Sequence, residues 1–216
     1  DGKVIGVGLH RDDAMAIPHT DYLETTYESS GFPSGMVDRV SYNGNVTLNR
    51  GYWEYITNIQ LSDTAICGLA IKSEVNGKNA TIEVHAGFST NLSGDYRLSV
   101  YLIEDDVSGI GYGYDQVNYY DTDSSSPFYG LGDPIDDYEH NHIVREVLSE
   151  SLGDEISTSA LISGGEHIET YTVDLSPYNN NNLSIVAFIN YVGLILTEHE
   201  VMNVQECQID DFQDWD

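Results

Sequence analysis

The sequence has little positive charge. Lysine and arginine together number 8 against 36 aspartates and glutamates, so the formal net charge is −28 at pH 7. A field of this sign repels phosphate backbones and anionic lipid headgroups, and we therefore expect no nucleic-acid partner. The same charge suits a secreted or surface protein that stays soluble by self-repulsion, and it favours divalent cations where carboxylates gather.

Cysteines and long apolar runs are also scarce. The two cysteines, Cys67 and Cys207, lie far apart and form no CxxC pair, which excludes a metal knuckle and a local redox motif. Because Cys67 lies in the apolar run "AICGLAI", we expect a buried free thiol, with a long-range disulfide as the alternative. No stretch approaches the ~20 apolar residues of a membrane span, and no signal-peptide pattern opens the chain. The protein is therefore either cytosolic or has had its export signal removed.

Enzymatic motifs are absent as well. The chain contains no GxSxG elbow, phosphate-binding loop, HExxH pair or dinucleotide-binding fingerprint. Paired carboxylates are too common in so acidic a chain to identify a glycosidase. We therefore expect a protein without catalytic activity.

The amino-terminal region predicts alternating strands and helices. The run "KVIGVGL" at 3–9 is typical of a buried strand, and "DYLETTYESS" at 21–30 is typical of a short helix capped by its first residue. In "GFPSGMVDRV" a turn at Phe32-Pro33, where a cis peptide is expected, leads into a strand at "MVDRV". The run "RGYWEYITNIQL" at 50–61 predicts a second, amphipathic helix.

From about residue 64 the sequence predicts strands only. Runs rich in β-branched and aromatic residues, separated by Gly, Asn, Asp and Ser, include "AICGLAIKSEV", "NATIEVHAGFS", "DYRLSVYLIED", "NHIVREVLS", "HIETYTVDLS" and "LSIVAFINYV". In "ATIEVHA", Ile82 and Val84 are expected on the face opposite Thr81 and His85. This spacing favours an antiparallel sandwich, which the long polar stretch from Ser108 to Tyr138 interrupts.

Several of these motifs resemble the Bacteroidetes family named for a twenty-eight-kilodalton outer membrane protein. The resemblance covers most of the chain: "VIGVGLH" and "SGFPSGMVDR" near the start, and an "ED" strand, a following Gln, a "Y-x-HNH-x-x-R" signature and a late "VAF" strand beyond. The corresponding residues are Glu104, Asp105, Gln116, Tyr138, His140, Asn141, His142, Arg145 and Val186 to Phe188. The HNHxxR spacing is the most specific part.

The resemblance implies a fold, a location and a missing element. The first region of the family is similar to a thioredoxin fold, and its members usually carry a cysteine pair ahead of the segment that opens this chain. We therefore expect an α+β protein, with a truncated thioredoxin-like α/β segment at 1–62 followed by an antiparallel β-sandwich at 63–216. It also implies an exported protein at the outer membrane or cell surface, held by a lipid anchor that is not part of this chain.

The signature residues Tyr138, His140, His142 and Arg145 allow two interpretations. Side chains two apart on a strand share a face, so the two imidazoles could bind one transition-metal ion. A third ligand such as Glu139 would point to the opposite face, which counts against that site. The favoured interpretation is structural, with the histidines paired to carboxylates and Arg145 tying its strand to a neighbour.

The polar stretch contains two further candidate sites. Asp121, Asp123 and Ser125 place oxygen ligands at alternate positions, as calcium loops do at their start, although the later positions of the helix-loop-helix motif do not match. Calcium is thus the one cofactor suggested, and solvated carboxylates are the alternative.

Tyrosines precede these carboxylates in "GIGYGYDQVNYY". They can form a surface that stacks on sugars or peptides, or they can simply cover the sandwich. The candidate binding residues are Tyr112, Tyr114, Tyr119 and Tyr120.

Thr64 lies in "DTA", which resembles the short motif that Bacteroidetes modify with O-glycans. The N-x-[ST] sequons at Asn45, Asn79, Asn91 and Asn182 matter only in a source that glycosylates asparagine.

These observations favour a non-catalytic binding protein of the cell surface, an adhesin or receptor for a host or polysaccharide ligand. The alternative is a thiol-disulfide oxidoreductase of thioredoxin type whose redox cysteines lie upstream of this chain and face the loop of Pro33.

Overall fold

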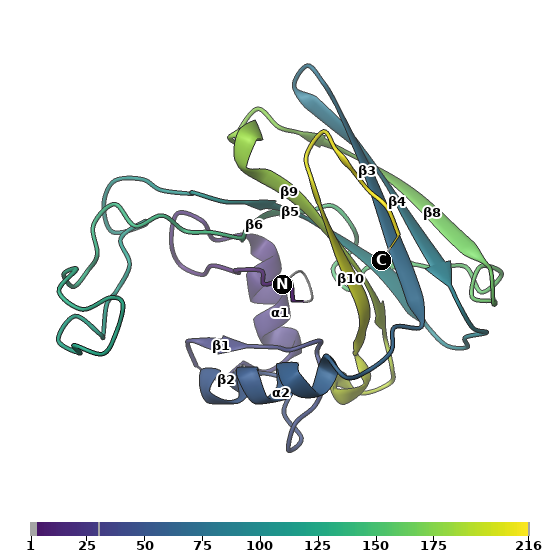
Figure 1. The fold of residues 1–216 in the computed structure, drawn as a ribbon, viewed down its shortest axis with the longest axis horizontal. Helices are drawn as coiled ribbons and strands as arrows, with labels where there is room; N and C mark the ends of the chain where they lie inside the picture. Colours follow the sequence, from purple (N-terminus) through teal and green to yellow (C-terminus); the bar gives the residue numbers. More distant parts are fainter. Residues whose placement is uncertain (1–3, 30, 216) are drawn as a thin grey trace.

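The computed structural model describes residues 4–29 and 31–215. It contains two antiparallel β-sheets packed against each other and a smaller amino-terminal region with two α-helices (Figure 1). Within the larger sheet, the strand order is β10 (Val201–Gln208), β9 (Leu183–Tyr191), β5 (Tyr96–Glu104) and β6 (Ile143–Val147), and β7 (Asp154–Glu155) also pairs with β5. The smaller sheet has the order β11 (Phe212–Gln213), β3 (Cys67–Asn76), β4 (Asn79–Phe88) and β8 (Glu166–Asp174).

The main core lies between the two sheets. Ile82 and Val84 of β4 are fully buried there, together with Leu98 of β5 and Ile185 of β9. The expected alternation along β4 is confirmed, because Thr81 is exposed and His85 is only partly buried. The prediction of antiparallel strands after residue 64 is likewise confirmed.

Strand β9 is buried along both faces, from Leu183 to Asn190. One face contributes to the inter-sheet core, and the other packs Val186 and Phe188 against apolar residues of the amino-terminal region, including Leu9 and Ile17. The run "LSIVAFINY" is therefore almost continuously apolar because it has no solvent face.

The amino-terminal region packs on that second face of the larger sheet. Its elements are α1 (Pro18–Thr26), β1 (Ser34–Gly35), β2 (Leu48–Asn49), η1 (Arg50–Tyr52) and α2 (Trp53–Gln60). Two short 3-10 helices, η2 (Asn180–Asn182) and η3 (Leu196–Glu198), flank β9.

The predicted strand at 3–9 is wrong for its described part, residues 4–9. This extended segment runs along the edge of β6 and forms one parallel bridge, in which the Gly8 nitrogen donates to the His142 carbonyl at 2.7 Å and the Gly8 carbonyl accepts from Val144 at 2.9 Å. Residue 3 lies outside the described residues. Because Gly8 is the only one of residues 4–9 with such a bridge, these residues form no ladder, and the Val4 side chain is 59% exposed.

Two other local predictions need correction. The first helix begins at Pro18, whose ring suits the first helical turn, so Asp21 lies inside that turn and does not cap the helix. The predicted strand at "MVDRV" does not form, because Asp38 and Arg39 have φ values of 46° and 54° and turn the chain. The Phe32-Pro33 peptide is cis, as predicted.

The second predicted helix is confirmed as η1 followed by α2, with Ile56 buried beneath it. The Trp53 indole nitrogen donates to the Leu48 carbonyl at 3.0 Å. Its ring also covers Gly35 so closely that a Cβ there would lie 2.9 Å from the indole. The antiparallel β1–β2 pair and α2 are therefore packed as one small unit.

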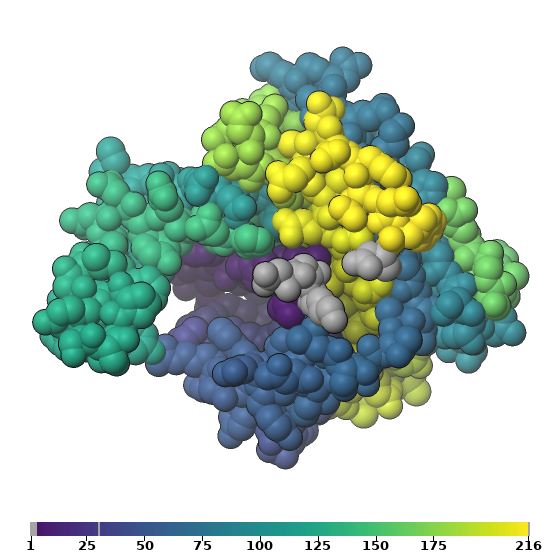
Figure 2. All heavy atoms as spheres, viewed as in Figure 1, coloured from purple at the N-terminus to yellow at the C-terminus, as the bar shows by residue number. Residues whose placement is uncertain are grey.

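The polar stretch between β5 and β6 forms a long loop that stands out from the sheets (Figure 1). In the space-filling view it reaches the region of η1 and α2, and a hollow lies beside the place where the two meet (Figure 2). Among the described residues, no helix is long and apolar enough to cross a membrane.

Candidate functional site

The loop at 108–138 is an ordered structure held by its own hydrogen bonds. Backbone bonds in both directions between Gln116 and Ile135, at 3.1 and 2.8 Å, close its outer part. Asn118 is 4% exposed and sits inside this closed turn. Its amide nitrogen donates to the carbonyls of Phe128 and Gly132, both at 2.9 Å, and its side-chain oxygen accepts from the backbone nitrogen of Tyr120 at 3.0 Å. The outer loop is thus preorganised without a hydrophobic core.

His140 fixes the base of the loop. Its backbone pairs with Val107 through two bonds of 2.9 Å, and its Nε2 contacts the Tyr114 carbonyl at 2.7 Å. The buried imidazole also packs edge-on against the rings of Tyr138 and His10, at 4.8 and 5.1 Å. His140 therefore joins the two arms of the loop to the amino-terminal segment.

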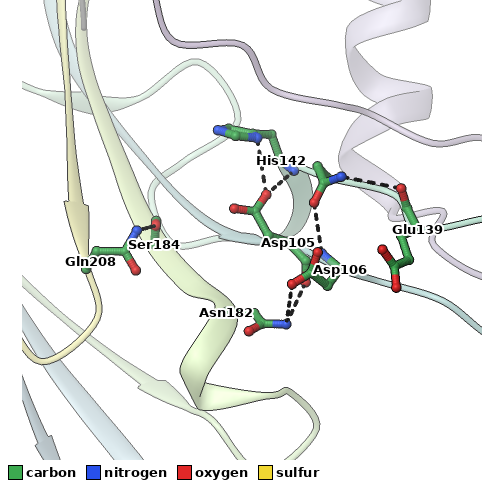
Figure 3. Close-up of polar contacts among 8 residues, drawn as sticks. Asp105, Asp106, Glu139, His142, Asn182, Ser184 and Gln208 are labelled. Carbon is green, nitrogen blue, oxygen red and sulfur yellow. Dashed lines mark hydrogen bonds and ion pairs between the residues drawn. The ribbon is translucent and has the colours of Figure 1, made fainter. Parts of the chain in front are cut away.

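His142 has different partners from His140. Its backbone nitrogen donates to Asp105 Oδ1 at 2.6 Å, and its Nδ1 lies 3.1 Å from the same oxygen (Figure 3). The φ value of His142 is 55°, and β6 begins only at Ile143, so the two histidines do not lie on a regular strand. Each imidazole has its own protein partner, and the pair does not converge on one point.

Asparagines complete this junction. Asn141 accepts from the backbone nitrogen of Asp106 at 3.1 Å, and the Asn182 amide donates to the Asp105 carbonyl and to Asp106 Oδ2 at 3.2 and 3.3 Å (Figure 3). The "ED" strand end, the HNH signature and the turn before β9 therefore form one polar network. Asn182, also the start of a sequon, is engaged in it.

Arg145 links β6 to β5 and to the segment that precedes η2. Its Nε lies 3.4 Å from Glu104 Oε2, and its guanidinium lies over the Tyr178 ring at 5.5 Å. Glu104 is 7% exposed, and its Oε1 accepts from the backbone nitrogen of Asn179 at 2.8 Å. A nearly buried carboxylate is thus paired and hydrogen-bonded, which offsets its loss of hydration.

The four candidate tyrosines separate into two pairs. Tyr112 and Tyr119 are 90% and 88% exposed. Tyr114 is half-buried against a cluster that contains Met15, and Tyr120 is half-buried under the Arg50 guanidinium at 5.2 Å. Tyr114 and Tyr120 therefore anchor the loop, whereas Tyr112 and Tyr119 face solvent.

The same loop exposes further apolar residues. Sequence reasoning did not single them out, because isolated apolar residues in a polar loop give no periodic signal. They are Ile110, Val117, Phe128, Tyr129 and Leu131. All five belong to the loop at 108–138, which therefore exposes more apolar side chains than Tyr112 and Tyr119 alone.

The candidate calcium residues form hydrogen bonds that stabilise turns of the loop. Asp123 Oδ1 accepts from the backbone nitrogen and the hydroxyl of Ser125, at 3.0 and 2.7 Å, and these bonds lower the pKa of Asp123. Asp121 Oδ1 accepts from the Gly132 nitrogen at 2.7 Å and so ties the two arms. Within residues 4–29 and 31–215 no three His, Cys, Asp or Glu side chains form a metal-binding group. Calcium stays a prediction.

A buried cation lies where the amino-terminal region packs on β9. Arg39 is 5% exposed, and its guanidinium lies over the rings of Tyr27 and Phe188 at 5.6 and 5.2 Å. Aromatic faces stabilise a cation that has lost its hydration. No sequence pattern marked this residue, because its partners are distant in the chain.

Two buried histidines accompany Arg39. His19 Nε2 lies 3.0 Å from the Tyr101 hydroxyl, and His199 Nδ1 lies 3.1 Å from the Tyr27 hydroxyl. Burial, with a smaller contribution from Arg39, lowers the pKa of His19 to about 4. The pKa of His199 is also lowered, chiefly by burial. Both imidazoles are therefore neutral at pH 7.

The comparisons with known proteins agree with this architecture. The family model described as outer membrane protein Omp28 matches residues 20–213. The chain belongs to the Omp28 family. The resemblance carried by the HNHxxR signature is thus confirmed, and so is the predicted localisation at the outer membrane.

One solved structure shares the fold of this Omp28 chain. HBP35 of Porphyromonas gingivalis matches with a TM-score of 0.67 at 18% identity, over 89% of this chain and 57% of HBP35. The chain thus spans little more than half the length of that protein. No curated protein matches.

The cysteines of the Omp28 chain are both free and buried, which confirms the expectation for Cys67 and excludes the long-range disulfide. Burial raises the pKa of Cys67 to about 12 and that of Cys207 to about 11, so neither is a reactive thiolate at neutral pH. Thr64, the candidate for O-glycosylation, is exposed in the connection between α2 and β3.

Proposed function

We propose that this Omp28-family chain is a non-catalytic binding protein of the cell surface, an adhesin or receptor that contacts a host or polysaccharide ligand through the loop at 108–138. A lipid anchor on the full-length protein, as in a surface lipoprotein, is part of this proposal. The observation that carries the proposal is an ordered loop with Tyr112 and Tyr119 almost fully exposed.

Physical reasons favour this loop as the contact surface. Because its hydrogen bonds are already formed, binding costs little conformational entropy. Tyrosine offers a large, rigid contact area with a polar tip, which suits both sugars and protein surfaces. The net charge of −28 disfavours anionic ligands.

The test is to screen the chain against arrays of glycans and host proteins, and then to repeat any binding with Tyr112→Ala/Tyr119→Ala. The double variant should weaken binding at least about tenfold. Tyr55→Ala is the matched control, because Tyr55 is also exposed, at 56%, but lies on α2. Equal binding by the double variant and the control would exclude this loop as the contact surface.

A second function has a specific observation in its favour. The order of α1, the Pro33 turn, the β1–β2 pair and α2 fits the second half of a thioredoxin-like region, which the resemblance implies. Neither Cys67 nor Cys207 can act as the redox thiol, since burial raises both pKa values. A thiol-disulfide oxidoreductase would therefore need cysteines upstream of this chain.

Disulfide reduction by the full-length protein separates the two functions. Insulin reduction by that protein, lost when an upstream cysteine pair is replaced by serine, would favour the oxidoreductase. Surface exposure on intact cells, with array binding by this chain alone, would favour the adhesin. If the full-length protein reduces disulfides and this chain binds nothing on the arrays, the adhesin proposal fails.

A further inference from the structure

The outer face of the smaller sheet carries a flat strip of small residues. Gly68 of β3 pairs with Gly87 of β4, which pairs with Glu166 of β8. One step along the same face, Ala70 and His85 pair. Because side chains alternate along strands, these residues point away from the inter-sheet core. The two glycines lie near one end of the sheet, where no Cβ covers the backbone of β3 and β4.

Trp215 lies over this strip. A Cβ built on Gly87 would lie 3.0 Å from Cζ3 of the indole, so the ring rests on the glycine. The ring also packs edge-on against His85 at 6.1 Å, yet Trp215 remains 48% exposed. The exposed part of a large aromatic ring is thus held in a fixed place.

A shallow groove of about 540 Å³ runs beside the indole. Trp215, Gly68 and Gly87 line it together with Phe88, Ser89 and the segment 164–166. This volume lies within the range of small-ligand sites, roughly 300–1,000 Å³. Because the groove is shallow and open, it can contact one side of a ligand that rests on the aromatic platform.

The charges on this face are paired with one another. His85 Nδ1 lies 2.7 Å from Glu166 Oε1, and His85 Nε2 lies 3.0 Å from Glu83 Oε1. Burial alone would lower the pKa of His85, but the bonds from Glu166 and Glu83 outweigh it and raise the pKa. Lys72 and Glu74 form a separate pair at 2.6 Å. Because Glu83 and Glu166 share one imidazole, the face keeps a small net negative charge, and binding of a basic segment is the competing outcome to be tested.

Anionic ligands are disfavoured. None of the described residues that line the groove is lysine or arginine, and the chain carries a net charge of −28. What the groove offers is an aromatic surface, an open backbone and the Glu166 carboxylate. The contacts of Glu166 with His85 use Oε1 and hold the side chain in place.

We propose that this groove binds a neutral carbohydrate, with a sugar ring against the Trp215 indole and sugar hydroxyls donating to the Glu166 carboxylate. A pyranose has an apolar face that suits an aromatic ring and hydroxyl groups that suit a carboxylate. The site uses no residue of the loop at 108–138, and Figure 1 shows β8 and that loop on opposite sides of the molecule. The two binding proposals can therefore fail independently.

The experiment uses the fluorescence of Trp215. The chain has two tryptophans, so Trp53→Phe leaves Trp215 as the only reporter. This variant is titrated with four neutral polysaccharides (mannan, laminarin, dextran and xylan), with anionic hyaluronate and with polylysine. We expect a saturable change in Trp215 emission with at least one neutral polysaccharide and none with hyaluronate or polylysine. Affinity electrophoresis of the unmodified chain in gels containing the same polysaccharides checks the result without the substitution.

Substitutions then locate the binding. The affinity for the polysaccharide is calculated from the retardation in the gel. Trp215→Ala should reduce this affinity at least tenfold, and Glu166→Gln should reduce it severalfold. Glu74→Gln is the matched control, because Glu74 is also an exposed glutamate paired with a basic side chain on this sheet, but it does not line the groove. It should bind normally, as should Tyr112→Ala/Tyr119→Ala. Circular dichroism verifies that each variant is folded.

Three results would overturn the proposal. The first is that no neutral polysaccharide of the panel binds. The second is binding that Trp215→Ala leaves unchanged. The third is saturable binding of polylysine alone, which would assign the groove to a basic protein segment.

Discussion

The two faces of the larger sheet are both buried, yet they are built from different chemistry. Toward the smaller sheet, Leu98, Leu102 and Ile185 are fully buried in an aliphatic core. Toward the amino-terminal region, the face carries Tyr101 and Phe188, over which histidines and Arg39 are packed. The first face is stabilised by apolar side chains of complementary shape, whereas the second also requires that its buried polar groups form hydrogen bonds or aromatic contacts with one another.

This difference predicts different responses to mutation and to pH. An aliphatic core contributes free energy in proportion to the area that it removes from water, at any ordinary pH. A buried cluster of imidazoles and one guanidinium contributes only while the imidazoles stay neutral. The packing of the amino-terminal region should therefore be the part of the fold whose stability depends on pH.

The largest effect should come from the inter-sheet core. Ile82→Ala removes three buried carbons from a fully buried site and should lower the free energy of unfolding by about 3 kcal/mol. Urea denaturation followed by circular dichroism measures it. Ile168→Ala is the control on the adjacent strand β8, because Ile168 is 49% exposed, and it should change stability by less than about 0.5 kcal/mol. Equal losses would mean that the core between the sheets is not the main source of stability.

The second prediction concerns acid, which should act on the amino-terminal face. The folded pKa of His19 is about 4, whereas an unfolded histidine has a pKa near 6.5. Between these two pKa values the unfolded chain binds protons that the folded chain does not. The free energy of unfolding therefore has its highest value above about pH 6.5 and decreases as the pH falls toward 4. The loss should be roughly 2 kcal/mol.

Two controls identify the groups responsible. His19→Gln/His199→Gln should flatten the dependence between pH 4 and 6.5, whereas His85→Gln should keep it, because the pKa of His85 is raised. The pKa of Asp38 is raised by burial and by Glu200, so this carboxyl acts in the opposite direction at the acidic end. Hydrogen exchange should show α1 opening before β4 at pH 5. Simultaneous opening of both elements would contradict the prediction that acid destabilises the amino-terminal region first.

The same contrast explains what could be predicted from the sequence. The strands of the inter-sheet core follow from alternation and β-branched composition, which are local signals, and "ATIEVHA" is an example. The strand predicted at 3–9 failed in its described part because the apolar run carries no information about partners, and of residues 4–9 only Gly8 is bridged to β6. The failure at "MVDRV" has the same origin, since the backbone turn at Asp38 and Arg39 places the guanidinium between aromatic rings.

The candidate site divides in a similar way. The HNHxxR spacing identified the family, and the long polar run correctly indicated a loop. Neither signal could show that Tyr114 and Tyr120 are anchors while Tyr112 and Tyr119 face solvent, because that depends on contacts with Met15 and Arg50. The histidines near Arg39 were missed for the same reason.

A third prediction asks whether the loop at 108–138 is stable independently of both faces. Asn118→Ala removes two donated bonds and one accepted bond inside the outer turn and should cost about 1–2 kcal/mol locally. Hydrogen exchange should accelerate between 116 and 135, while the urea midpoint of the sheets changes little. Asn181→Ala, at an exposed asparagine of η2, should leave both unchanged. A large drop in the urea midpoint would show that the loop folds as one unit with the sheets.

The smallest effect expected is that of calcium on the same loop. If Asp121 and Asp123 bind the ion with a dissociation constant near 1 mM, then 5 mM calcium stabilises the native state by about 1 kcal/mol and raises the melting temperature accordingly. Asp121→Ala/Asp123→Ala should remove that increase.

Asp174→Ala is the matched control, because Asp174 accepts from Ser176 in the same way that Asp123 accepts from Ser125, but it lies at the end of β8. Because any cation screens so acidic a chain, the shift is measured against sodium chloride of equal ionic strength. A shift that persists in the double variant, or that sodium chloride reproduces, would leave these carboxylates with the turn hydrogen bonds as their only role.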